Sequence, residues 1–147
     1  MDINCAGRRR RSRRQESTFL PTATSPLSSP SEAIEAIRIA THNGTAPTGI
    51  AACIDSDGYP ITMMIVDDCP ADGVPKILDV VLDAAGPRFP VASMILAISR
   101  PGTDPAPTAQ ERLWWHQLVV RAEASGVDLW AWYALADGEV EVIGSRG

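Results

Sequence analysis

The residues with the clearest chemical potential lie in the segment from Ile95 to Glu111. An apolar run ends there, a proline-punctuated loop follows, and a helix is predicted to begin. Loops fixed to the end of a rigid strand often carry catalytic or metal-binding groups. This loop has no histidine and no cysteine, so its candidate groups are the carboxylates of Asp104 and Glu111 and the guanidinium of Arg100.

A second group of candidates is Asp67-Asp68-Cys69, at the end of another predicted strand. It offers carboxylates and a thiol. Together with Asp104 and Glu111 it could form an unrelated hydrolytic or metal site, provided that all of these groups converge in space.

Other catalytic signatures are missing from the sequence. It has no glycine-rich phosphate loop, no GxSxG motif and no CxxC pair. The two histidines, His42 and His116, are far apart in sequence and do not make a ligand pair. His42 falls at a predicted helix end, where an imidazole interacts favourably with the helix dipole.

The elements that position these groups are predicted from hydrophobic periodicity and turn residues. Ser29, Pro30 and Glu32 form a capping-box pattern that predicts a first helix, which an Asn-Gly pair at 43–44 ends. The range 48–68 has two apolar stretches around a Ser-Asp-Gly turn, and it predicts a β-hairpin.

Two more helices are predicted after the hairpin. Asp72 is expected to cap the first of them, and Gly86 to end it. Its apolar stripe is built from Val74, Ile77, Leu78, Val81 and Leu82. Thr108 and Glu111 are spaced as a capping box and open the second helix, which runs to Ser125.

Three more strands complete the predicted fold. The apolar runs 91–99 and 127–135 are typical of strands covered on both faces, and an Asp-Gly turn leads to a last strand at 139–143. The element order is α-β-β-α-β-α-β-β. It predicts an α/β fold of mixed α+β kind, with a central mixed sheet flanked by helices.

The loop and its neighbours share a set of positions with one known family. A strand ends in Ile-Leu-Ala, and prolines, an Asp-Pro pair, a helix-opening hydroxyl residue, a helix-ending glycine and an Asp-Gly turn follow. The positions are Ile95-Leu96-Ala97, Pro101, Asp104-Pro105, Pro107, Thr108, Gly126 and Asp137-Gly138. They resemble the C-terminal domain of the RadC DNA-repair-related proteins, which have the JAB/MPN metalloprotease fold of cytidine-deaminase-like type. The resemblance covers residues 48–147.

The departures from this resemblance fall on the chemistry. The family's two metal-binding histidines fall on Ile98 and Arg100, and its metal-binding aspartate falls on Glu111. Its Asp-His pair becomes Ala-Trp at 131–132, and 48–55 holds no glutamate to act as general base. Ile98 cannot bind a metal ion, and the charge of Arg100 repels one. The resemblance therefore implies a degenerate site, with no catalytic residue, metal or cofactor, at Ile98, Arg100, Asp104, Thr108 and Glu111.

Arg100 also suggests how the place of the metal is filled. Its guanidinium follows the predicted strand directly, and two carboxylates lie further along the same loop. We expect Arg100 to pair with Asp104 or with Glu111.

Charge separates a basic arm from an acidic body. The first 14 residues hold six arginines and one acid, and the remainder holds seven basic and 17 acidic side chains. We expect 1–28 to be a disordered Arg/Ser/Pro-rich arm and 29–147 to be a single domain. An acidic body does not suit phosphate binding, so Arg8–Arg14 is the predicted contact if the chain binds nucleic acid.

Cysteine use and hydropathy bear on location. Three cysteines form an odd set without a CxxC pair, which is typical of a reduced, cytoplasmic protein. No apolar run reaches the roughly 18–20 residues that a membrane span needs, so no membrane association is expected.

Four tryptophans make a heavy load for 147 residues. We expect Trp115 and one of Trp130 and Trp132 to build the core. Trp114 and the remaining strand tryptophan are then candidates for a binding surface.

The sequence therefore favours a non-catalytic RadC-like domain that acts as a binding or scaffold protein. Its partner would be an unidentified protein or a second copy of the chain. One alternative is a hydrolase with a rebuilt site around Asp104, Glu111 and Asp67. Another is a protein that associates with nucleic acid through its basic arm.

Overall fold

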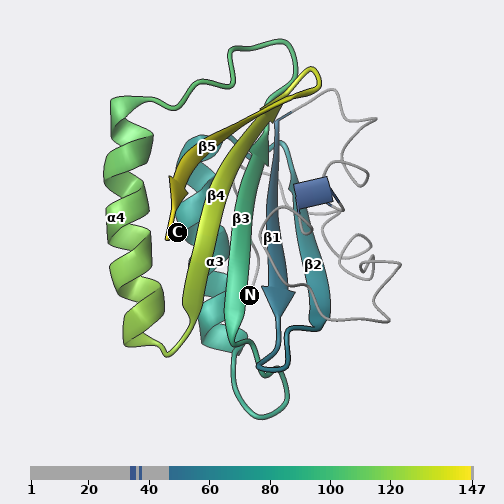
Figure 1. Ribbon diagram of the computed structural model, residues 1–147, viewed down its shortest axis with the longest axis vertical. Coiled ribbons are helices and arrows are strands. Elements are labelled where there is room, and N and C mark those ends of the chain that lie inside the picture. Colours follow the sequence, from purple (N-terminus) through teal and green to yellow (C-terminus); the bar gives the residue numbers. More distant parts are fainter. Residues whose placement is uncertain (1–33, 36, 38–46, 147) are drawn as a thin grey trace.

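A five-stranded mixed sheet with two helices packed on it makes an α+β fold (Figure 1). The computed structural model describes residues 34, 35, 37 and 47–146. Its elements are β1 (Thr48–Ile54), β2 (Pro60–Asp67), the 3-10 helix η1 (Ala71–Gly73), α3 (Val74–Ala84), β3 (Ser93–Ser99), α4 (Ala109–Ala124), β4 (Asp128–Ala136) and β5 (Glu139–Ser145). The strand order is β2-β1-β3-β4-β5. The predicted mixed sheet with helices packed on it is confirmed.

The predicted hairpin is formed by β1 and β2. Asp55 fixes its turn, because one carboxylate oxygen accepts the backbone N–H groups of Asp57 and Tyr59, both at 2.9 Å. Gly58 has a φ of 88°, a conformation that costs glycine little. Strand β1 pairs antiparallel with β2 on one side and with β3 on the other.

The second half of the sheet uses one crossover and one tight turn. Strands β3 and β4 are parallel, so the chain must return through a crossover, and α4 supplies it. Strands β4 and β5 are antiparallel and are joined at Asp137 and Gly138, whose φ angles are 49° and 88°. Positive φ at both residues is what a two-residue hairpin turn with the twist of a sheet requires.

The sheet is apolar on both faces. Helices α3 and α4 lie on the same face (Figure 1), where Leu96, Ile98 and Trp132 belong to the larger buried cluster. The opposite face carries a second buried cluster of Ile34, Ile37, Ile50, Ala52, Ile54, Met63, Ile65, Ile95, Ala97, Ala131, Tyr133 and Leu135. This explains why β3 and β4 read as continuous apolar runs, as predicted.

The start of α3 differs from the prediction. The residue before its first turn is Gly73, and no side chain caps the helix. Asp72 lies inside η1, so the prediction that it caps the helix is wrong. Pro75 occupies the first turn instead. Backbone N–H groups of the first turn have no acceptor within the helix, so the N–H that proline lacks is not needed there. The helix ends at Ala84, two residues before Gly86.

The predicted apolar stripe of α3 is largely confirmed. Val74, Ile77, Leu78 and Val81 are buried, whereas Leu82 is only half-buried. For the first predicted helix, Ile34 and Ile37 are helical and buried, and the predicted caps at 29–32 and 43–44 lie outside the described residues.

Burial of Cys53 gives the fold a testable dependence on alkaline pH. Burial raises the pKa of its thiol from 9.0 to about 12. The unfolded chain therefore releases this proton first, so the stability that the neutral thiol contributes is complete below pH 9.0 and is lost as the pH rises toward about 12. We expect the free energy of unfolding to fall by about 1.4 kcal/mol per pH unit in that window from this group.

Urea unfolding at several alkaline pH values measures this loss, with Cys53→Ala as the control. Burial also raises the pKa of Tyr133, which adds a loss of the same sign in both chains. The variant should therefore show a shallower decline than the wild type. Equal declines would rule out Cys53 as the source.

Candidate functional site

The candidate site is the loop between β3 and α4. Alternate residues of β3 face the helices, and Arg100 continues the row that contains Met94, Leu96 and Ile98. The backbone N–H of Arg100 donates to the carbonyl of Leu135 at 2.8 Å, which extends the pairing of β3 with β4 by one residue. The guanidinium is thereby aimed at the first turn of α4.

Arg100 and Glu111 form a two-point ion pair. Nη1 donates to Oε2 of Glu111 at 2.6 Å, and Nη2 donates to Oε1 at 3.2 Å. Nη2 also donates to the carbonyls of Pro105 and Ala106, at 3.1 and 3.2 Å. The side chains are 15% and 3% exposed, so both charges are largely withdrawn from water. The predicted ion pair is confirmed, with Glu111 rather than Asp104 as the partner.

The predicted capping box holds Glu111 in place. Its backbone N–H donates to Oγ1 of Thr108 at 3.0 Å, and its Oε1 accepts the backbone N–H of Thr108 at 2.9 Å. One carboxylate therefore caps α4 and binds Arg100 at the same time. Asp104 has a separate, local role, since its carboxylate accepts the backbone N–H of Ala106 at 2.9 Å.

The loop is also tied to the turn between β4 and β5. Both carboxylate oxygens of Asp137 accept the backbone N–H of Gly102, at 3.1 and 3.0 Å. The hydroxyl of Thr103 donates to the carbonyl of Arg100 at 2.7 Å. The sequence predicted a turn at Asp137 but not this contact, which joins residues 35 positions apart.

The site does not fit a zinc ion. Ile98 is buried in the core and offers no donor atom. Glu111 is engaged by Arg100, whose charge repels a dication. Over the described range, no three His, Cys, Asp or Glu side chains are grouped as a metal site would require. Catalytic zinc needs about three protein ligands and one open position.

The second group of candidates lies at the same end of the sheet but on another strand. Thr48 of β1 is the register partner of both Asp67 on β2 and Ser99 on β3. Strand β1 therefore separates the Asp67 end from the Arg100 loop. Asp67 is exposed, whereas Cys69 is fully buried.

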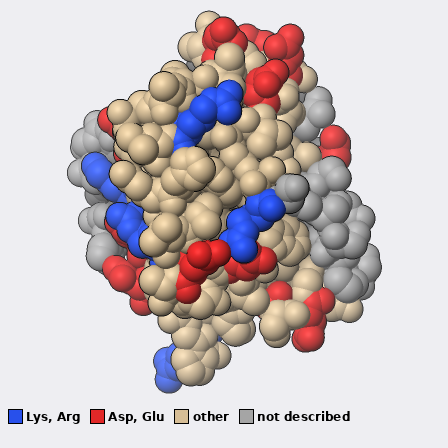
Figure 2. All heavy atoms as spheres, turned by 60° about the vertical axis from the view of Figure 1, so that its left-hand side comes forward, with Lys and Arg blue, Asp and Glu red and all other residues tan. Residues whose placement is uncertain are grey.

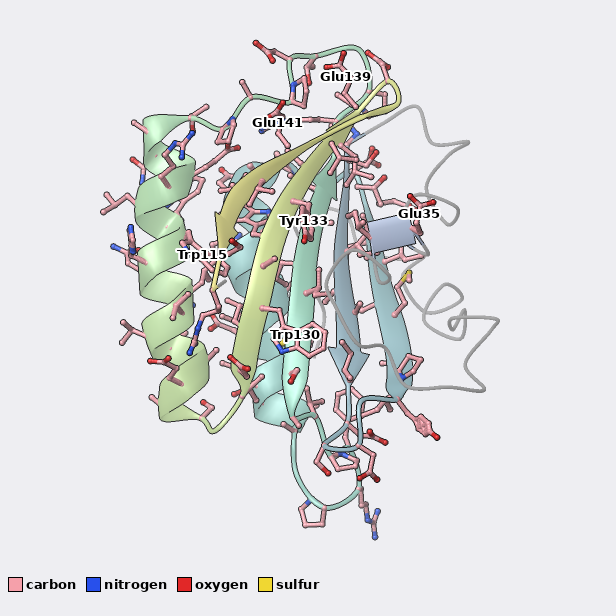
Figure 3. All side chains as sticks on the ribbon, in the orientation of Figure 1. Glu35, Trp115, Trp130, Tyr133, Glu139 and Glu141 are labelled. Atoms are coloured by element: carbon pink, nitrogen blue, oxygen red, sulfur yellow. The ribbon has the colours of Figure 1, made fainter. Side chains whose placement is uncertain are left out.

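The four tryptophans do not form one surface. Trp115 and Trp132 are buried in the cluster beneath the helices, as predicted for two of the four. Trp132 is fully buried, so its assignment to a binding surface is corrected. Trp114 is half-buried against that same cluster, and Trp130 is half-buried on the opposite face. Figure 3 shows Trp115 pointing from α4 toward the sheet and Trp130 lying across the front face.

Among the residues that the structure describes, two buried side-chain donors have no hydrogen-bond partner: Nε of Arg100 and Nε1 of Trp132. Trp132 takes the place of a histidine in the resemblance, and its indole is buried in the cluster on the face that the two helices cover. Sequence reasoning did not identify these donors, because a missing acceptor is a property of the packed structure.

One surface feature also escaped sequence reasoning. Leu113 and Val120 on the outer side of α4 are 53% and 67% exposed. Their separation of seven residues, two helical turns, was the available signal. The basic arm, Arg8–Arg14, lies outside the described residues.

Comparison with known proteins adds no family assignment. Neither the family models nor the curated proteins searched gave a match to this sequence. In the described part of the chain, no helix is long and apolar enough to span a membrane.

Proposed function

We propose that this chain is a non-catalytic RadC-like domain of the JAB/MPN fold that acts as a cytoplasmic binding or scaffold protein. The mixed sheet and the element order from β1 to β5 support the fold part of this proposal. Cys53 and Cys69 are both buried thiols, which fits a reducing compartment.

The observation that carries the proposal is the buried pair of Arg100 and Glu111. The positions aligned with a metal site hold a cation and its counter-ion, linked through two hydrogen bonds. A zinc ion there would have to displace the guanidinium and leave its charge buried without a partner. Breaking a buried pair in this way typically costs about 3–5 kcal/mol.

A binding role is supported by what the outer surface offers. Leu113 and Val120 are both more than half exposed, although they are apolar and belong to a helix. Trp114, the residue after Leu113, is half-buried. Exposed apolar groups on a helix, near an aromatic residue, are typical of protein contact surfaces.

Thermal unfolding of the full chain with and without zinc tests the non-catalytic proposal. A ligand that binds the folded state raises its stability by mass action. We expect the same Tm in excess zinc, in chelator and in plain buffer. A Tm that rises with zinc and falls with chelator would contradict the proposal.

A further inference from the structure

The outer side of α4 carries apolar residues, although the solvent-exposed side of a helix is usually charged or polar. With 3.6 residues per turn, Leu113, Gln117, Val120 and Ala124 lie on one side of the helix. The buried side is formed by Glu111, Trp115, Leu118 and Ala122. We call the first set, Leu113–Gln117–Val120–Ala124, the outer stripe of α4.

Helix α3 shows what a solvated outer side looks like in the same domain. Its exposed positions are Lys76, Asp79, Asp83 and Ala84, and three of these four residues are charged. The outer stripe of α4 has no charged residue, and it holds two of the four large apolar side chains that are exposed among the described residues. Figure 2, which turns the α4 side forward, shows uncharged surface between the charged groups. Single exposed apolar residues are ordinary, whereas two in line on one helix, with no charged residue between them along the stripe, form an apolar patch.

We propose that the outer stripe is a dimer contact, in which α4 packs antiparallel against α4 of a second copy of this chain. This proposal rests on the proposed function, for which it names the partner. Spacings of four, three and four residues along the stripe match the seam of paired helices. A two-fold axis near Leu118 and Val119 places Leu113 opposite the small Ala124 of the second copy.

In the antiparallel arrangement, the residues on each flank of the stripe face complementary residues on the same flank of the second copy. On one flank, His116 faces Glu123 of the second copy, where the imidazole can donate to the carboxylate. On the other flank, Trp114 faces Arg121 of the second copy, a cation over an aromatic ring. A parallel arrangement would instead turn each flank toward the opposite flank of the second copy, and it would bring the residues of the stripe against their own copies, Leu113 against Leu113 and Gln117 against Gln117.

The flanking charges already have partners within one copy. Arg121 contacts Asp79 at 3.0 Å, and Glu123 contacts Arg146 at 2.7 Å. All four side chains are about half exposed, so these pairs are weak and can share a further partner.

The contact is small, which is typical of a weak and reversible association. A helix of 16 residues is about 24 Å long, so a single helix pair buries less than the roughly 1,600 Å² of a standard interface. We therefore expect a reversible dimer with a Kd of about 10 µM.

Sedimentation equilibrium of the full chain, from about 1 µM to about 1 mM, tests the pairing. The wild type should pass from the 15.7 kDa monomer to a dimer. Leu113→Glu and Val120→Glu should each raise the Kd at least about 30-fold, since each places a charge in the seam. Both positions are exposed and glutamate favours helix, so circular dichroism should show an unchanged fold.

Two further variants make the assignment specific. Val142→Glu is the matched control, because Val142 is 46% exposed on the edge strand β5, away from the stripe. Its Kd should equal that of the wild type. His116→Lys places a fixed cation opposite Glu123 of the second copy, and it should lower the Kd about 3-fold.

Each outcome has a defined meaning. A chain that stays monomeric throughout overturns the pairing, as does dissociation caused by Val142→Glu but not by Leu113→Glu. Zinc binding measured on the same samples separates the two proposals. A monomer without zinc overturns the pairing alone, and a dimer that binds zinc supports the pairing while contradicting the non-catalytic function.

Discussion

Glu111→Ala is expected to destabilise the domain by about 3 kcal/mol or more. The substitution leaves the guanidinium of Arg100 in a largely buried place with only the carbonyls of Pro105 and Ala106 as acceptors. It also removes the acceptor for the backbone N–H of Thr108, and so half of the capping box of α4. Equilibrium unfolding in urea measures the change.

A double-mutant cycle shows whether the ion pair is the cause. Arg100→Ala should cost a similar amount, since Glu111 is only 3% exposed and would keep an unpaired charge. The double variant Arg100→Ala/Glu111→Ala should cost clearly less than the sum of the two single variants, because it leaves no buried charge.

Asp79→Ala is the matched control for this cycle. The pair of Asp79 with Arg121 is about half exposed on each side, and such pairs contribute less than about 1 kcal/mol. If Glu111→Ala costs no more than this control, the buried pair does not stabilise the loop. Additive single effects would lead to the same conclusion.

The double variant Ile98→His/Arg100→His is expected to create a zinc site. The two positions lie on the same face of β3, two residues apart, and both face the side where α4 packs. Removal of the guanidinium frees the carboxylate of Glu111. Two imidazoles and a carboxylate are a ligand set that catalytic zinc sites use. We expect a Kd of about 1 µM, where the wild type has no measurable affinity.

Calorimetric titration with zinc measures that affinity, and Ile98→Ala/Arg100→Ala is its control. The control removes the same two side chains without adding a ligand. The buried histidine should lower the Tm of the metal-free variant, and zinc should raise it again by mass action. A folded variant that binds no better than the control would mean that the three positions do not converge, and it would remove the basis of the RadC-like assignment.

Local signals predicted most of the fold. The capping box at Thr108 and the turns at Ser56–Gly58 and Asp137–Gly138 depend on residues a few positions apart, and all three form as expected. Asp72 was assigned wrongly because the tight turn η1 shifts the start of α3 by one residue. The Pro, Asp and Gly residues of 70–73 are compatible with that turn, but Asp72 in the same stretch is also compatible with a helix cap.

Long-range contacts limited what could be predicted about the site. Asp104 and Glu111 were equal candidates for Arg100 until the packing of α4 brought Glu111 against the end of β3. Trp130 and Trp132 are two positions apart, yet they lie on opposite faces, because the pairing of β3 with β4 skips Trp130. An irregularity of this kind depends on both strands and cannot be inferred from one.

The outer stripe of α4 illustrates a different limit. The buried positions of a helix can usually be recognised in the sequence, because they form a single apolar side. Helix α4 has apolar residues on two sides. The buried Trp115 and Leu118 were enough to predict an amphipathic helix, so there was no reason from the sequence to assign a role to Leu113 and Val120. Their exposure in the folded chain distinguishes the two sides.

The most direct test of the central claim is the metal content of the full, untagged chain, purified without chelator and dialysed against zinc. Because Arg100 and Glu111 are paired at positions that the proposed RadC-like resemblance assigns to metal ligands, we predict a molar ratio of zinc to protein near zero. A ratio near one would contradict the account. Repeating the measurement on Glu111→Ala would then show whether the ion is held at the β3–α4 loop or elsewhere.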